Sequence, residues 1–141
     1  MKDLMPKELI FTVIELESDT FHPLLLADFD GLDDYWWVID TGASKSVMDI
    51  GFAEHYFPEE SEIVMATGLG KEVVSTASGI IEDLKLGGFS FGPLKVALVD
   101  FQHINTEYSK FSDKKIIGLI GCDFLYSHKA VIDFSLNTIS L

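Results

Sequence analysis

Short apolar runs rich in valine, isoleucine, phenylalanine and tryptophan recur along this chain between turn signals. No long segment keeps the 3.6-residue period of an amphipathic helix, and runs of this length and composition are typical of β-strands. At 141 residues with 48% hydrophobic residues, the chain is long enough to bury one core and too short for two ordinary domains. We therefore predict a single all-β domain over residues 1–141. Its strands include 9–17, 22–28, 79–86, 94–100, 130–134 and 138–141.

Three stretches depart from the β pattern. Residues 46–56 favour one or two helical turns, and residues 123–128 favour a second short helix. Residues 105–115 are mostly polar, which predicts a surface loop.

The run Tyr35–Ile39 is an unbroken apolar segment that stops at Asp40-Thr41-Gly42. Such a run is typical of a strand buried on both faces. An ionised carboxylate at the end of a buried strand needs hydrogen bonds, and Gly42 allows a tight turn whose amides can face it. Taken alone, the tripeptide is also compatible with an ordinary turn that ends a strand.

Charge and residue types exclude several function classes. The net charge is −13 and all ten basic residues are lysines, so we expect no nucleic acid and no membrane surface as a partner. The one cysteine, Cys122, cannot form an intrachain disulfide. The four histidines are widely separated, so we expect no metal and no cofactor.

The N-terminal segment lacks the pattern of a signal peptide. The apolar run 9–14 is interrupted by Thr12 and flanked by Glu8 and Glu15. No run approaches the roughly 20 apolar residues of a membrane span. We expect a cytoplasmic location.

Two motifs in a fixed order resemble the retropepsin-like aspartic proteases, in their cellular, bacterial and gag-polyprotein-like branch. Residues 38–44, Val-Ile-Asp-Thr-Gly-Ala-Ser, are similar to that family's Asp-Thr-Gly-Ala after a hydrophobic strand. Residues 116–125, Ile-Ile-Gly-Leu-Ile-Gly-Cys-Asp-Phe-Leu, are similar to its C-terminal block, and residues 130–134 also fit the family. The resemblance implies a closed β-barrel with one or two short helices, half of a pepsin-type bilobal fold.

The resemblance also implies an internal organisation for the single domain. Residues 1–21 are an N-terminal strand or extension, and residues 35–44 are the catalytic strand and loop. Residues 64–75 are a candidate flap hairpin, with Thr67, Gly68, Leu69 and Gly70 at its tip contacting substrate. An ordinary surface hairpin is the alternative for this segment. Residues 116–141 are the C-terminal structural block.

The family hydrolyses peptide bonds with two carboxylates that share one proton. This chain has one Asp-Thr/Ser-Gly motif, so the resemblance implies a homodimer in which the two Asp40 side chains activate a water against a peptide or protein substrate. It assigns Asp40, Thr41 and Gly42 as the catalytic residues. Thr41 would bond across the dimer axis and Gly42 would donate its amide to the Asp40 carboxylate.

The sequence departs from the viral enzymes of that family in two places. Cys122 stands where the viral block has an arginine, and the chain contains no arginine at all. Ser44 and Lys45 replace acidic residues. Two alternatives to an endopeptidase therefore stay open: a non-catalytic peptide-binding or dimerisation module, and a monomer in which Asp40 is only structural.

Overall fold

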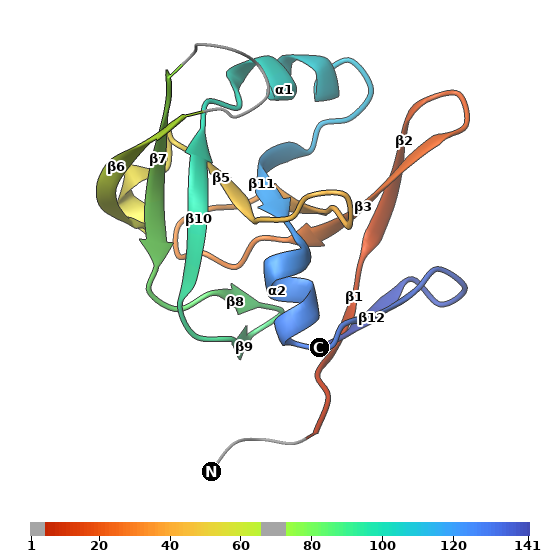
Figure 1. Ribbon diagram of the computed structural model, residues 1–141. Coiled ribbons are helices and arrows are strands. Elements are labelled where there is room, and N and C mark those ends of the chain that lie inside the picture. The colour runs from red at the N-terminus through yellow and green to blue at the C-terminus, as the bar shows by residue number, and fades with distance from the viewer. Residues whose placement is uncertain (1–4, 66–72) are drawn as a thin grey trace.

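The computed structural model describes residues 5–65 and 73–141, and this part of the chain is mostly β with two short α-helices (Figure 1). A large sheet contains, in order across it, β2 (Thr12–Glu17), β3 (Thr20–Leu26), β4 (Tyr35–Ile39), β11 (Lys115–Ile120), β5 (Val47–Asp49), β10 (Leu94–Val99), β7 (Val73–Ile81) and β6 (Phe57–Met65). A small sheet contains β1 (Glu8–Ile10), β13 (Thr138–Ser140) and β12 (Val131–Asp133). The other elements are the hairpin of β8 (Lys85–Leu86) and β9 (Phe89–Ser90), the 3-10 turn η1 (Ala53–His55), and the helices α1 (Gln102–Tyr108) and α2 (Cys122–Ser127).

The large sheet does not close into the barrel that the resemblance implied. Among the described residues, β2 and β6 form the two edges of the sheet. β2 pairs with β3, and β6 pairs with β7. The reason lies at Phe11, whose amide binds the carbonyl of Asn137, so that β1 leaves β2 and pairs with β13 in the separate small sheet. The N-terminal segment therefore joins the C-terminal hairpin instead of bridging the edges of the large sheet.

The strand β11 brings the two sequence motifs together at the centre of the sheet. It runs parallel to β4, with Ile120 opposite Ile39, and antiparallel to β5, with Gly118 opposite Met48. A Cβ atom on Gly118 would collide with the carbonyl oxygen of Val47 and the ring of Trp37. Close packing of three strands around this position therefore requires glycine.

Side chains of β4 enter hydrophobic clusters on both faces of the sheet, which confirms the expected burial. Trp37 and Ile39 belong to the main cluster, which includes Phe124 of α2. Val38 belongs to a second cluster beneath α1. In Figure 1, α1 lies at one end of the molecule and α2 continues from β11 in its middle.

Two local predictions were wrong. Residues 105–115 are not a loop throughout, because Phe101, Ile104 and Tyr108 follow a helical spacing and α1 packs all three against the second cluster. The side-chain amide of Asn105 binds both backbone groups of Ile116, at 2.7 and 3.0 Å, which fixes α1 on β11.

The second error concerns residues 46–56, where helical structure is limited to one turn because residues 47–49 form a strand. β5 forms because its residues 47–49 pair with both β11 and β10, and helical structure is limited to the 3-10 turn η1. The short helix predicted at residues 123–128 is confirmed as α2. No helix in the described ranges is long and apolar enough to cross a membrane.

Candidate active site

Asp40 is the first residue after β4, and backbone contacts fix it at the end of the strand. Its amide donates to the carbonyl of Ile120 at 2.9 Å, which extends the pairing with β11 by one residue. Its Oδ1 accepts the amide of Gly42 at 2.9 Å, and its carbonyl accepts the amide of Ala43 at 3.2 Å. A Cβ on Gly42 would lie 3.2 Å from Oδ1, so a side chain there would crowd the carboxylate. The loop thus orients one carboxylate oxygen through its own backbone.

The C-terminal motif lies directly against this loop. The amide of Cys122 donates to the carbonyl of Ala43 at 2.8 Å, and its thiol donates to the carbonyl of Thr41 at 3.0 Å. A Cβ on Gly121 would lie 2.8 Å from the carbonyl oxygens of both Ala43 and Lys45. Glycine at this position allows the two backbones to touch.

Ser46 and Asp123 form a buried clamp between the same two segments. Ser46 is fully buried, and its Oγ donates to Asp123 Oδ1 at 2.8 Å while accepting the amide of Gly121 at 2.9 Å. The same Oδ1 accepts the amides of Ser46 at 3.0 Å and of Phe124 at 2.9 Å. Because a buried polar group is costly unless it is paired, this network holds the Asp40 loop and the start of α2 in one arrangement.

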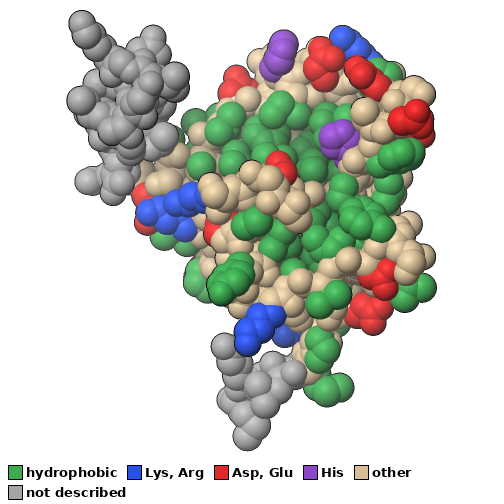
Figure 2. Space-filling model, turned by 45° about the vertical axis from the view of Figure 1, so that its right-hand side comes forward, with side chains coloured by type: hydrophobic (Ala, Val, Ile, Leu, Met, Phe, Trp, Pro, Cys, Tyr) green, Lys and Arg blue, Asp and Glu red, His purple; other side chains and the backbone are tan. Residues whose placement is uncertain are grey.

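A hollow of about 330 Å³ opens beside Asp40. Its lining residues are Phe21, His22, Pro23, Val38, Ile39, Asp40, Thr41, Ile132 and Phe134. Phe21 and Phe134 are 59% and 63% exposed, which is high for aromatic side chains. Figure 2 turns forward the side of the molecule on which the β2–β3 and β12–β13 hairpins lie, and hydrophobic side chains gather across it.

His22 lines the same hollow as Asp40, and Tyr108 contacts His22. The hydroxyl of Tyr108, at the end of α1, is 3.4 Å from Nδ1 of His22. Burial raises the pKa of Tyr108, and the negative charge of Asp40 raises it further. The Tyr108 hydroxyl therefore keeps its proton at neutral pH and remains a hydrogen-bond donor.

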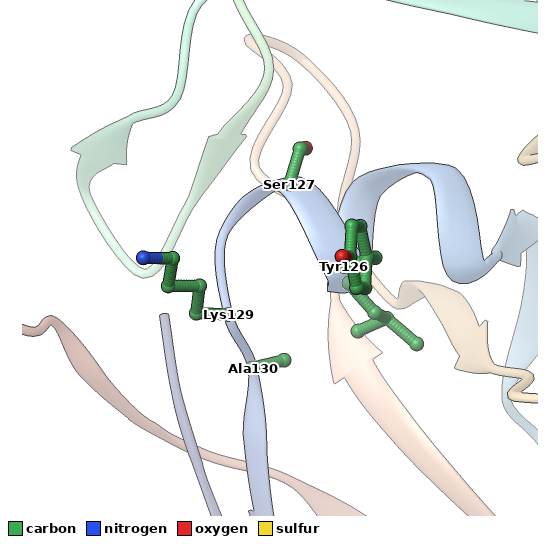
Figure 3. A pocket seen from close by; sticks show the side chains of 5 residues that line it. Tyr126, Ser127, Lys129 and Ala130 are labelled. Atoms are coloured by element: carbon green, nitrogen blue, oxygen red, sulfur yellow. The ribbon is translucent and has the colours of Figure 1, made fainter.

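Another hollow lies away from the Asp40 loop. One of about 540 Å³ lies at the end of α2, where Tyr126, Ser127, Lys129 and Ala130 surround it (Figure 3). None of its lining residues belongs to the Asp40 loop. Across residues 5–65 and 73–141, no three histidine, cysteine or acidic side chains are grouped as a metal site requires. The candidate flap residues Thr67, Gly68, Leu69 and Gly70 lie outside the described residues.

Sequence reasoning missed the roles of four residues in and around this site: Ser46, Asp123, His22 and Tyr108. The sequence pattern gave no role to Ser46, and Asp123 appeared only as one residue of the C-terminal motif. A polar pair 77 positions apart leaves no local pattern, so the resemblance was the one signal that joined the two segments. His22 and Tyr108 also lack a local signal, because their positions near this site depend on strand register and on α1.

Comparison with known proteins gives one match. A family model described as aspartyl protease matches residues 26–124, which is more than half of the chain and includes the Asp40 loop. This match is consistent with the resemblance to retropepsin-like proteases. Neither the curated proteins nor the solved structures contain a match.

Proposed function

This chain belongs to the aspartyl protease family, and we propose that it is a retropepsin-type endopeptidase that acts as a homodimer. The observation that carries the proposal is the placement of Asp40. A carboxylate with one oxygen oriented by the Gly42 amide opens onto a hollow with apolar walls. The family's chemistry needs an oriented carboxylate of this kind beside an extended peptide.

A second copy of the chain is needed because the hollow contains one of the two carboxylates of a catalytic pair. Asp40 is the one carboxylate among its lining residues, and hydrolysis of this type needs two carboxylates that share a proton. A two-fold axis beside Asp40 would bring its counterpart from the second subunit into contact. The two subunits together would be the counterpart of a bilobal pepsin-type molecule.

Each group then has a distinct role. One ionised Asp40 accepts a proton from the attacking water, while the protonated Asp40 of the other subunit donates a hydrogen bond to the scissile carbonyl. The proton returns to the leaving amine as the C–N bond breaks. Gly42 orients the carboxylate, and Thr41 hydrogen-bonds across the axis beneath the pair. No metal or cofactor takes part in this scheme.

Cleavage of a diverse peptide mixture tests the proposal. The wild-type protein, Asp40→Asn and Asp33→Asn are incubated with the mixture over about pH 3 to 7, and products are identified by mass spectrometry. Asp33 is an exposed aspartate, so Asp33→Asn controls for the loss of one negative charge. We expect cleavage by the wild type and the control, and a loss of at least about 100-fold in Asp40→Asn.

A non-catalytic peptide-binding or dimerisation module is the second candidate. It is favoured by Cys122, whose thiol binds the Thr41 carbonyl where the viral enzymes of this family carry an arginine. Peptide binding that persists in Asp40→Ala, without cleavage by any variant, would support this candidate and exclude the endopeptidase.

A further inference from the structure

His22 lies beside Asp40 through the register of β3 and β4. Leu24 pairs with Val38 and Leu25 pairs with Trp37 in this antiparallel pair. β3 continues beyond the end of β4, and the same register carried two residues further sets His22 opposite Asp40. Both side chains line the hollow of about 330 Å³.

Tyr108 contacts one ring nitrogen of His22, Nδ1. The Tyr108 hydroxyl lies 3.4 Å from Nδ1, at the long end of the hydrogen-bonding range, and the two rings meet edge to face with centroids 5.8 Å apart. A protonated tyrosine hydroxyl can either donate or accept, so the direction of this contact follows the tautomer of His22. In the tautomer whose Nδ1 accepts from Tyr108, the proton of the neutral ring is on Nε2, which makes that nitrogen a donor.

The rest of the hollow defines what this donor can recognise. Its other walls are mostly apolar and accommodate the aliphatic part of a long side chain: Phe21, Pro23, Val38, Ile39, Ile132 and Phe134. Asp40 is a negatively charged neighbour, so a carboxylate in the hollow would be repelled. An uncharged acceptor at the end of a long side chain satisfies both conditions.

We propose that His22, held by Tyr108, is a specificity-determining residue that donates from Nε2 to an uncharged terminal acceptor, such as the amide oxygen of glutamine, on the peptide beside Asp40. The inference rests on the proposed function, since it assigns a preference to the same site. It names a substrate class: peptides with a long, neutral, hydrogen-bond-accepting side chain next to the scissile bond.

The test compares two peptides that differ only by glutamine or methionine at that position, because these side chains have similar length and only glutamine has a strong acceptor. The measured quantity is the ratio of kcat/KM for glutamine to that for methionine. We expect a ratio of about three to ten in the wild type, as one hydrogen bond would give. The ratio should fall to about one in His22→Phe.

Three further variants separate hydrogen bonding from a structural effect. His22→Gln keeps an N–H donor and should keep part of the preference. Tyr108→Phe removes the hydroxyl that contacts Nδ1, so either ring nitrogen of His22 can carry the proton. The ratio should then fall without reaching one. His103→Phe is the matched control, since His103 is exposed on α1 and should leave the ratio unchanged. An unchanged ratio in His22→Phe, with cleavage intact, would overturn this inference and leave the proposed endopeptidase standing.

A binding measurement distinguishes the two failures. Fluorescence anisotropy of the same labelled peptides is measured with Asp40→Asn and with Asp40→Asn carrying His22→Phe. A glutamine preference in binding that depends on His22 supports the inference even if no variant cleaves. Absence of cleavage with this preference present would exclude the endopeptidase and leave the role of His22 standing. Absence of both cleavage and preference would overturn both.

Discussion

Ser46 is the residue through which the Asp40 loop and the C-terminal motif are held together. Ser46→Ala removes the donor to Asp123 and leaves the Gly121 amide unpaired in a buried position. We expect the free energy of unfolding to fall by about 1–3 kcal/mol, the usual cost of an unsatisfied buried group. Urea denaturation monitored by tryptophan fluorescence measures this change.

Ser44→Ala is the matched control, because Ser44 is an exposed serine in the same loop. Its free energy of unfolding should stay within about 0.5 kcal/mol of the wild-type value. Equal stability of Ser46→Ala and Ser44→Ala would show that the Ser46–Asp123 clamp does not hold the loop.

Among the elements, β11 carries the closest packing. Gly118→Ala would place a methyl group against the Val47 carbonyl and the Trp37 ring, neither of which can move without separating β11 from β5 or β4. We expect loss of the cooperative thermal transition or a fall in Tm of more than about 10 °C. Circular dichroism during heating provides the measurement.

The control for this substitution is Gly51→Ala. A Cβ at Gly51 would lie 3.5 Å from the nearest atom, Oδ1 of Asp49, which is an ordinary contact. A wild-type Tm for this variant is expected. If Gly118→Ala also kept the wild-type Tm, the close packing of β11 between β4 and β5 would be wrong.

The turn between β12 and β13 depends on an ionised aspartate. The Ser135 hydroxyl, followed by the amides of Leu136 and Ser135, lowers the pKa of Asp133 below its usual value. Because the pKa of Asp133 is lowered in the folded state, the ionised side chain stabilises the fold at pH values above the usual aspartate pKa. This stabilisation is lost as the pH falls through the pKa of Asp133 in the folded state. We expect the Ser135 and Leu136 amide NMR signals to shift between about pH 5 and pH 2.

Asp133→Asn retains an acceptor oxygen but cannot titrate. The same two amide signals should therefore stay constant over this pH range. Signals that titrate equally in Asp133→Asn would assign the change to another group.

How much of the fold could be predicted depended on where each element obtains its stability. β4 could be predicted from its own residues, because an unbroken apolar run has one stable location, the centre of the sheet. α1 and β5 could not, since α1 is stabilised by contacts of Phe101 and Tyr108 with a distant cluster and β5 by pairing with two remote strands. For the same reason Asp40 could be identified from the sequence, whereas its neighbour His22 could not.

At the scale of the whole molecule, charge opposes the association of two copies. Each chain carries −13 at neutral pH, so a dimer would carry −26. Acidification lowers the net negative charge of each chain and thereby reduces the repulsion. We expect the dimer Kd to be several-fold lower at pH 5 than at pH 7, as measured by sedimentation equilibrium.

High salt screens the same repulsion and serves as the control. At about 0.5 M salt the difference between the two Kd values should become small. Equal Kd values at pH 5 and pH 7 in low salt would contradict the electrostatic part of this account.

In the proposed dimer, two chains each supply one Asp40 to a single site. Wild-type protein is mixed with increasing amounts of Asp40→Asn protein at constant total concentration, and peptide cleavage is measured after subunit exchange. If both carboxylates are required, activity follows the square of the wild-type fraction, so an equal mixture retains about one quarter of the activity. Activity that falls in direct proportion to the wild-type fraction, to about one half in the equal mixture, would contradict the shared site.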